Sequence, residues 1–165
     1  MMGLNMYPLQ PPAWTRVILI MACMAMLMGC QPFGNALRYA KIPTRHLLLI
    51  PQQGTLHMTW EARHLTITFK GKVRQNLLTI HGNILRGEGI RRFSRLDDLV
   101  VDVYFTNSSG AVLQHEAFHS MNNSPLNKVL HTFQSRFELP KGGTHIAFGY
   151  DGKADGQHFH HNPFN

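Results

Sequence analysis

The sequence predicts an all-β protein, a single antiparallel β-sandwich of about seven or eight strands that follows an apolar N-terminal segment. Three observations predict this fold. After residue 45, short stretches alternate apolar and polar side chains, as half-buried strands do. Gly, Pro, Asn and Asp residues separate these stretches at the spacing typical of sandwiches. No stretch after residue 30 keeps a helical period. The sequence therefore predicts one domain built from sheets.

The first four predicted strands are short and each ends at a turn signal. Residues 46–50 are apolar and are followed by a Pro- and Gly-containing segment. In residues 55–60, Leu56, Met58 and Trp60 share one face, and residues 63–69 repeat this alternation. Lys70, Gly71 and Lys72 are predicted to turn the chain, and residues 76–85 form the next strand.

The last four predicted strands form two hairpins. Residues 99–106 and 111–118 are joined by residues 107–110, which suit a type I turn followed by Gly110 in the left-handed conformation. Residues 129–139 and 144–150 pair around a Pro- and Gly-rich connection. Hairpins of this kind indicate an immunoglobulin-like or similar sandwich over residues 46–150, with residues 151–165 as a flexible, histidine-containing tail.

An apolar run from Val17 to Gly29 is preceded by Arg16, the pattern of a signal-peptide core. At thirteen residues it is shorter than the roughly 20 that a spanning helix needs. Leu27-Met28-Gly29-Cys30 resembles the lipobox of bacterial lipoproteins, although Met28 is bulkier than the residue usual there. The resemblance predicts a signal peptide over residues 1–29, and a lipidated Cys30 with a tether over residues 30–45.

The lipobox resemblance implies a diacylglycerol thioether on Cys30, cleavage before it and an N-acyl chain on the new amino terminus. Two or more chains anchor a protein stably. Gln31 is not the Asp that retains such lipoproteins in the inner membrane, so we expect the outer membrane, facing the periplasm. Cys23 offers a weaker match because too little apolar sequence precedes it. An uncleaved N-terminal anchor is the alternative, and translation could start at Met2 or Met6.

The exported part is basic and contains no cysteine after Cys30. Of the 16 Lys and Arg residues only Arg16 precedes Cys30, and none of the 9 acidic residues does, so the mature part carries +6. Such a charge favours anionic headgroups or acidic polymers, although plain solubility explains it too. Nucleic acid is not expected as a partner in this compartment.

His115-Glu116-Ala117-Phe118-His119 matches the HExxH pattern of zinc proteases, which requires a helix that brings both histidines to one metal. Here the motif continues a predicted strand, where residues four apart are separated by about 13 Å. We expect His115 beside Val103, on or near the apolar face, and Glu116 near Asp102. The match is therefore interpreted as coincidental, and no enzyme activity is expected.

Two further clusters are candidate sites. Histidines bind Zn, Cu or Ni, so a metal site is considered at His145, His158, His160 and His161, with a solvated tail as the simpler interpretation. A basic cluster could bind an anion, although pairing of its arginines with Asp97 and Asp98 explains it more simply. Its members are Arg86, Arg91, Arg92 and Arg95.

The sequence therefore predicts a membrane-anchored envelope lipoprotein that acts as a non-enzymatic binding or assembly module. The alternative is a periplasmic metal-binding or metal-handling protein that uses its histidines. We expect no cofactor beyond the covalent lipid on Cys30, and as partners the membrane and an envelope protein.

Overall fold

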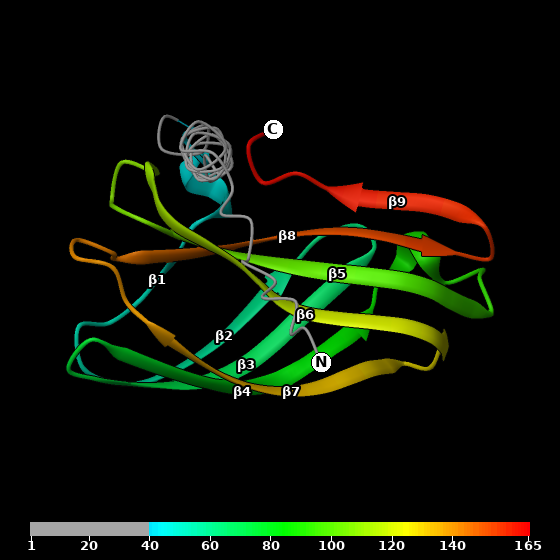
Figure 1. Ribbon diagram of the computed structural model, residues 1–165, viewed down its shortest axis with the longest axis horizontal. Coiled ribbons are helices and arrows are strands. Elements are labelled where there is room, and N and C mark those ends of the chain that lie inside the picture. The colour runs from blue at the N-terminus through cyan, green and yellow to red at the C-terminus, as the bar shows by residue number, and fades with distance from the viewer. Residues whose placement is uncertain (1–39) are drawn as a thin grey trace, which may run out of the picture. The chain divides into compact units, whose positions relative to one another are not determined.

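The computed structural model describes residues 40–165. The predicted signal peptide and Cys30 lie outside the described residues. Within them, two antiparallel sheets pack face to face, which confirms the predicted all-β sandwich (Figure 1).

The described chain contains nine strands and two short 3₁₀ helices. Their bounds are η3 Thr44–His46, β1 Leu48–Leu49, β2 Gly54–Glu61, β3 Leu65–Arg74, β4 Leu77–Arg86, η4 Glu88–Ile90, β5 Arg95–Thr106, β6 Val112–Pro125, β7 Val129–Glu138, β8 His145–Ala154 and β9 Gln157–His161.

The four-stranded sheet has the order β2-β3-β4-β7. Its alternation is strict: on β3, Leu65, Ile67 and Phe69 are buried while the residues between them face outward. The predicted turn at residues 70–72 is wrong, because β3 continues through these residues to Arg74. The chain instead reverses at Gln75, which adopts a φ of 57°.

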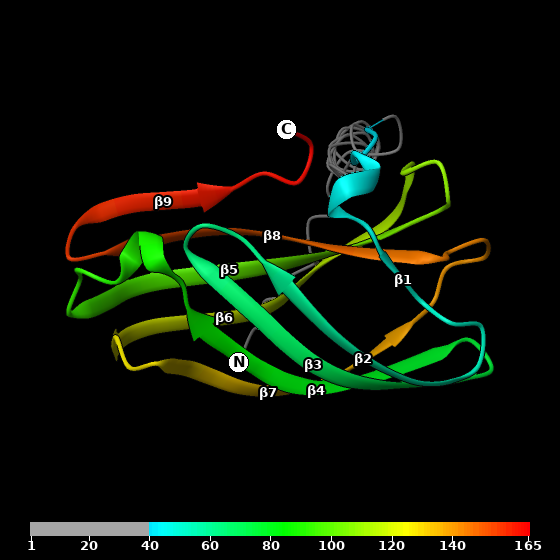
Figure 2. The ribbon, with the colours of Figure 1, turned by 180° about the vertical axis from the view of Figure 1, so that it is seen from behind.

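The five-stranded sheet has the order β1-β8-β5-β6, and β9 also pairs with β8. Figure 2 shows β1 and β9 beside opposite ends of β8, and the register places them at residues 145–146 and 150–154. The chain crosses between sheets after β1, β4, β6 and β7. This strand order differs from the ABED and CFG sheets of immunoglobulin domains, so the likeness to them is one of architecture.

The core lies between the inner faces of both sheets. Phe148 on β8 is fully buried, and its ring centroid lies 5.6 Å from Trp60, 5.7 Å from Phe69 and 5.7 Å from Phe118. These rings come from β2, β3 and β6, so one side chain joins the two layers. Burying aromatic surface of this kind supplies much of the stability of a domain without disulfides.

The predicted tether is wrong for its last part, because residues 40–45 pack on the sandwich. Ile42 is 1% exposed and joins a small cluster with Tyr104, Val112 and Ala147. The backbone N–H of Ile42 donates to the carbonyl of Gly110 at 2.9 Å. Apolar burial and this hydrogen bond fix a segment whose Pro content suggested a linker.

The prediction of a flexible tail is also wrong, because residues 157–161 form β9. Asp155 and Gly156 both adopt positive φ values, 45° and 79°, and join β8 to β9 in a tight hairpin. The Asp155 carboxylate accepts hydrogen bonds from the backbone N–H groups of Ser94 and Arg95, at 2.8 and 3.1 Å. Phe159 is 5% exposed and anchors the strand in the core.

Candidate functional site

The outward face of the four-stranded sheet is polar and basic. Cross-strand register places His57, Lys70, His81 and Gln134 in one row and Thr55, Lys72, Thr79 and Arg136 in the next. Arg74 follows Lys72 on the same face of β3. Strand pairing thus collects residues from four separate segments on one surface.

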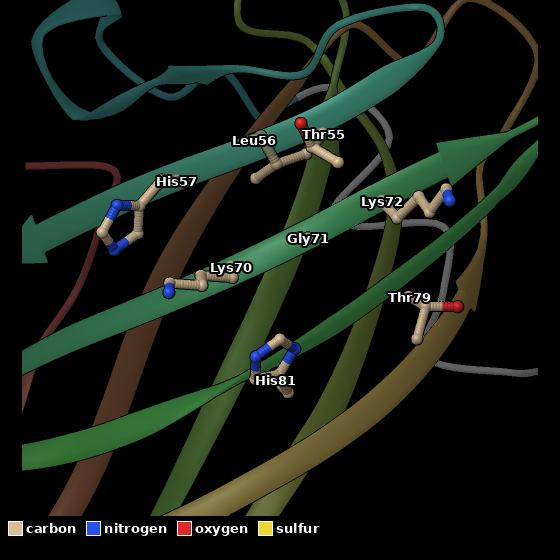
Figure 3. A pocket seen from close by; sticks show the side chains of 8 residues that line it. All are labelled: Thr55, Leu56, His57, Lys70, Gly71, Lys72, Thr79 and His81. Atoms are coloured by element: carbon tan, nitrogen blue, oxygen red, sulfur yellow. The ribbon is translucent and has the colours of Figure 1, made fainter.

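A depression of about 530 Å³ lies on this face over β2, β3 and β4 (Figure 3). Its polar lining side chains come from β2, β3 and β4, and a smaller hollow of about 180 Å³ adjoins it and shares His57, Lys70 and His81. The lining residues of the larger hollow are Thr55, Leu56, His57, Lys70, Gly71, Lys72, Thr79 and His81. We call this hollow the basic pocket.

The basic pocket has cations and hydroxyls but no carboxylate in its lining. Within the described residues neither Lys70 nor Lys72 takes part in a salt bridge. The outward face of the other sheet is different, because Asp98, Asp102 and Asp151 lie on it and Lys153 is the cation opposite Asp98. The two outer surfaces therefore differ in the sign of their charge.

Gly71 explains how the sheet stays tightly packed beneath the basic pocket. A Cβ at this position would lie 3.0 Å from Cγ of Leu56 and 3.1 Å from Cγ2 of Ile80. The glycine therefore lets the side chains of β2 and β4 meet under β3, while its two lysine neighbours point outward.

The HExxH match lies on β6, as predicted, but its register differs from the prediction. Thr106 pairs with Val112, whereas Phe105 pairs with Gln114, so Leu113 is an extra residue. This bulge moves His115 opposite Tyr104, on the outer face, and not beside Val103. The imidazole of His115 stacks on the Tyr104 ring at 4.6 Å, and its Nε2 lies 3.3 Å from Oδ1 of Asp102.

A second bulge, at Phe118, directs the last two residues of the motif away from the outer face on which His115 lies. Phe118 packs into the core, and His119 stacks on His131 of β7 with ring centroids 3.9 Å apart. Nε2 of His119 is buried without a hydrogen-bond partner. Burial, followed by the nearby His131, lowers the pKa of His119 below its usual range.

The four histidines predicted as a metal site are not brought together. His145 is at one end of β8, opposite Leu49, whereas His158, His160 and His161 are on β9, which pairs with the other end. His158 and His160 face outward, and His161 faces Tyr150. Among residues 40–165 no group of three metal-binding side chains has a geometry that could hold an ion.

A cluster that the sequence did not predict surrounds His161. Its ring lies 5.3 Å from Trp60, 5.7 Å from Tyr150 and 5.6 Å from His46. Nδ1 of His64 is 2.9 Å from the Tyr150 hydroxyl, which also accepts a hydrogen bond from the His64 backbone N–H. We call His46, His64, His160 and His161 the histidine cluster, because each is close enough to influence the charge of another.

Burial governs the ionisation of this cluster. It is the main cause of the lowered pKa of His161, to which His46, His64 and His160 add, and of the lowered pKa of His64. Burial also raises the pKa of Tyr150 to about 12. The neutral forms are therefore favoured where these rings pack.

The predicted arginine cluster is dispersed. Arg95 pairs with Asp97 at 3.0 Å, as the simpler interpretation expected, whereas Arg91 pairs with Glu88. Arg86 donates to the carbonyl of Leu126, and Arg92 donates to the Gln157 side chain. Arg91 and Arg92 line a shallow hollow with Arg63, but Glu88 lines it too. Unlike the basic pocket, this hollow therefore has a carboxylate in its lining.

No protein-family model, functionally characterised protein or solved structure matches this chain significantly. Among residues 40–165, no helix has the length and apolar character required to cross a membrane.

Proposed function

We propose that the protein is a lipid-anchored, non-enzymatic binding module of the bacterial cell envelope, attached through Cys30 and facing the periplasm from the outer membrane. Its binding surface is the basic face of the β2-β3-β4-β7 sheet. The observation that carries the proposal is the basic pocket, where lysines and hydroxyls gather in a hollow that has no carboxylate among its described lining residues. A surface of one sign with a recess favours a ligand of the opposite sign.

The positions of the HExxH residues support a binding role over a protease role. His115 stacks on Tyr104 on the outer face, while His119 packs against His131 across the edge of the sandwich. One zinc ion needs both imidazoles within about 2 Å of it, which these opposed directions do not favour.

Replacing Cys30 by serine tests the anchor. The variant is expected to lose fatty-acid labelling and to leave the membrane fraction, because lipidation requires the thiol and the acyl chains supply the membrane affinity. Metabolic labelling with an alkyne fatty acid, followed by fractionation, measures both effects. Cys23→Ser is the matched control and keeps its label. A labelled Cys30→Ser protein would contradict the assignment of the anchor.

The second candidate function, metal handling, is favoured by the histidine cluster. His46 and His64 each lie near His161 and come from different segments, and Nε2 of His161 is buried without a hydrogen-bond partner among the described residues. A small movement of side chains could direct two or three imidazoles to one ion of the kind that prefers nitrogen ligands.

Zinc titration of the full chain in detergent micelles decides between these functions. If metal handling is the function, calorimetry gives a stoichiometric site that disappears in the His161→Phe variant and persists in the His145→Phe variant. If binding at the basic face is the function, the wild-type chain binds zinc weakly and without fixed stoichiometry.

A further inference from the structure

We propose that the basic pocket binds the phosphoryl groups of a linear, phosphate-bearing envelope polymer that lies along β3. This inference rests on the proposed function for the compartment and for the choice of the binding face. It adds the chemical class of the ligand and its direction on the sheet.

The spacing of the cations on β3 argues for a linear ligand. Lys70, Lys72 and Arg74 occupy alternate positions of one strand and all three are exposed on the same face. Alternate residues of a strand are about 6.7 Å apart, so the three cations form a straight row about 13 Å long. A chain with repeated anionic groups can contact the whole row, whereas a single small anion contacts one end.

The neighbouring strands add donors beside this row. His57 and His81 flank Lys70, and Thr55 and Thr79 flank Lys72, each on a directly paired position. A phosphoryl oxygen accepts hydrogen bonds from several directions, and a lysine ammonium binds phosphate as a point charge. The pocket lining contains no arginine, so its lysines offer point charges rather than the planar fork that binds a carboxylate or a phosphate through two hydrogen bonds.

The composition of the face argues against other anionic partners. No Phe, Tyr or Trp side chain points outward from these four strands. Bases of single-stranded nucleic acid are recognised largely by stacking on aromatic side chains, whereas an anionic bilayer surface is the alternative that the liposome competition tests. Ion pairing and hydrogen bonds are what this surface offers, and phosphoryl groups use both.

Long-range charge also favours this face as the docking surface. The carboxylates on the outward side of the four strands, Glu61 and Glu138, lie at the ends of β2 and β7 and not in the basic pocket. Glu138 accepts a hydrogen bond from the Asn76 side chain. The other outer surface carries Asp98, Asp102 and Asp151 and is therefore less favourable for the same polymer.

The test titrates the full chain, extracted in a nonionic detergent, with inorganic polyphosphate as the probe. The Lys70→Glu/Lys72→Glu variant is expected to bind at least about tenfold more weakly and with a shallower dependence on salt, because two fewer counterions are displaced. The matched control is Lys128→Glu/Lys141→Glu, which changes the net charge equally at exposed positions outside the basic pocket and keeps wild-type affinity. Circular dichroism verifies that both variants are folded.

The comparison ligands separate the other occupants. Polyglutamate of similar length is expected to bind more weakly than polyphosphate, and liposomes of phosphatidylcholine with phosphatidylglycerol are expected not to compete with it. Equal binding of polyglutamate, competition by the liposomes, or equal losses in both double variants would each overturn the proposal. None of these binding results affects the labelling of Cys30. Failure of the ligand assignment can therefore be distinguished from failure of the proposed anchor.

Discussion

Replacing Gly110 by alanine is expected to lower the free energy of unfolding by about 2–4 kcal/mol, from two separate causes. Gly110 has a φ of +81°, where a side chain is strained. A Cβ at this position would also lie only 2.2 Å from the carbonyl oxygen of Ile42. The N-terminal segment would have to move, and Ile42 would leave the cluster around Tyr104.

Gly142 is the matched control because its φ, +82°, is nearly the same, and a Cβ there would meet nothing within 4 Å. Gly142→Ala therefore measures backbone strain alone, and we expect a loss of about 1–2 kcal/mol. Chemical denaturation of both variants gives the two values. Equal losses would mean that the contact between Ile42 and Gly110 does not constrain the segment.

Acidification below about pH 6.5 is expected to destabilise the fold progressively. His64, His119 and His161 all have a pKa that burial lowers from 6.5. The unfolded chain therefore takes up protons at a higher pH than the native protein, and stability falls as pH decreases. Well above pH 6.5 both states are neutral at these positions, so they add no pH dependence there. The three contributions have the same sign and add.

Measuring the free energy of unfolding between pH 8 and pH 4.5 tests this expectation. In the His161→Phe variant the decline with acid should be shallower, because the ring still packs against Trp60 and Tyr150 but cannot take up a proton. His158→Gln, at an exposed position of the same strand, serves as the control and keeps the wild-type slope. An unchanged slope in the His161→Phe variant would show that this histidine is not kept neutral by packing.

The sandwich could be predicted because alternation is a local property of the chain. Leu65, Ile67 and Phe69 identify β3 without knowledge of its partners. The register of β6 could not be predicted, because the extra residue Leu113 depends on how two strands twist against each other. The last hairpin had a local signal that the sequence prediction missed: Asp155-Gly156 is a typical two-residue hairpin turn.

The candidate site was missed for a related reason. Lys70-Gly71-Lys72 has the composition of a turn, which is why the sequence predicts one there. In the structure Gly71 is instead buried where the side chains of Leu56 and Ile80 converge. The basic pocket also needs His57 and His81, which meet Lys70 only through cross-strand pairing. Conversely, His145 and His158 are close in a histidine-rich part of the sequence but are far apart along β8. His145 lies at one end of β8, whereas His158 is on β9, which pairs with the other end.

The opposite signs of the two outer surfaces give the sandwich an electric dipole directed across its layers. If the proposed anchor holds the domain beside a charged layer, such a dipole prevents even tumbling, since the torque turns the four-stranded sheet toward negative charge and the five-stranded sheet away. The alignment weakens as added electrolyte shortens the Debye length. At physiological ionic strength the Debye length is about 8 Å, which is less than the thickness of the domain. Orientation would thus respond to the ionic surroundings without any change in the fold.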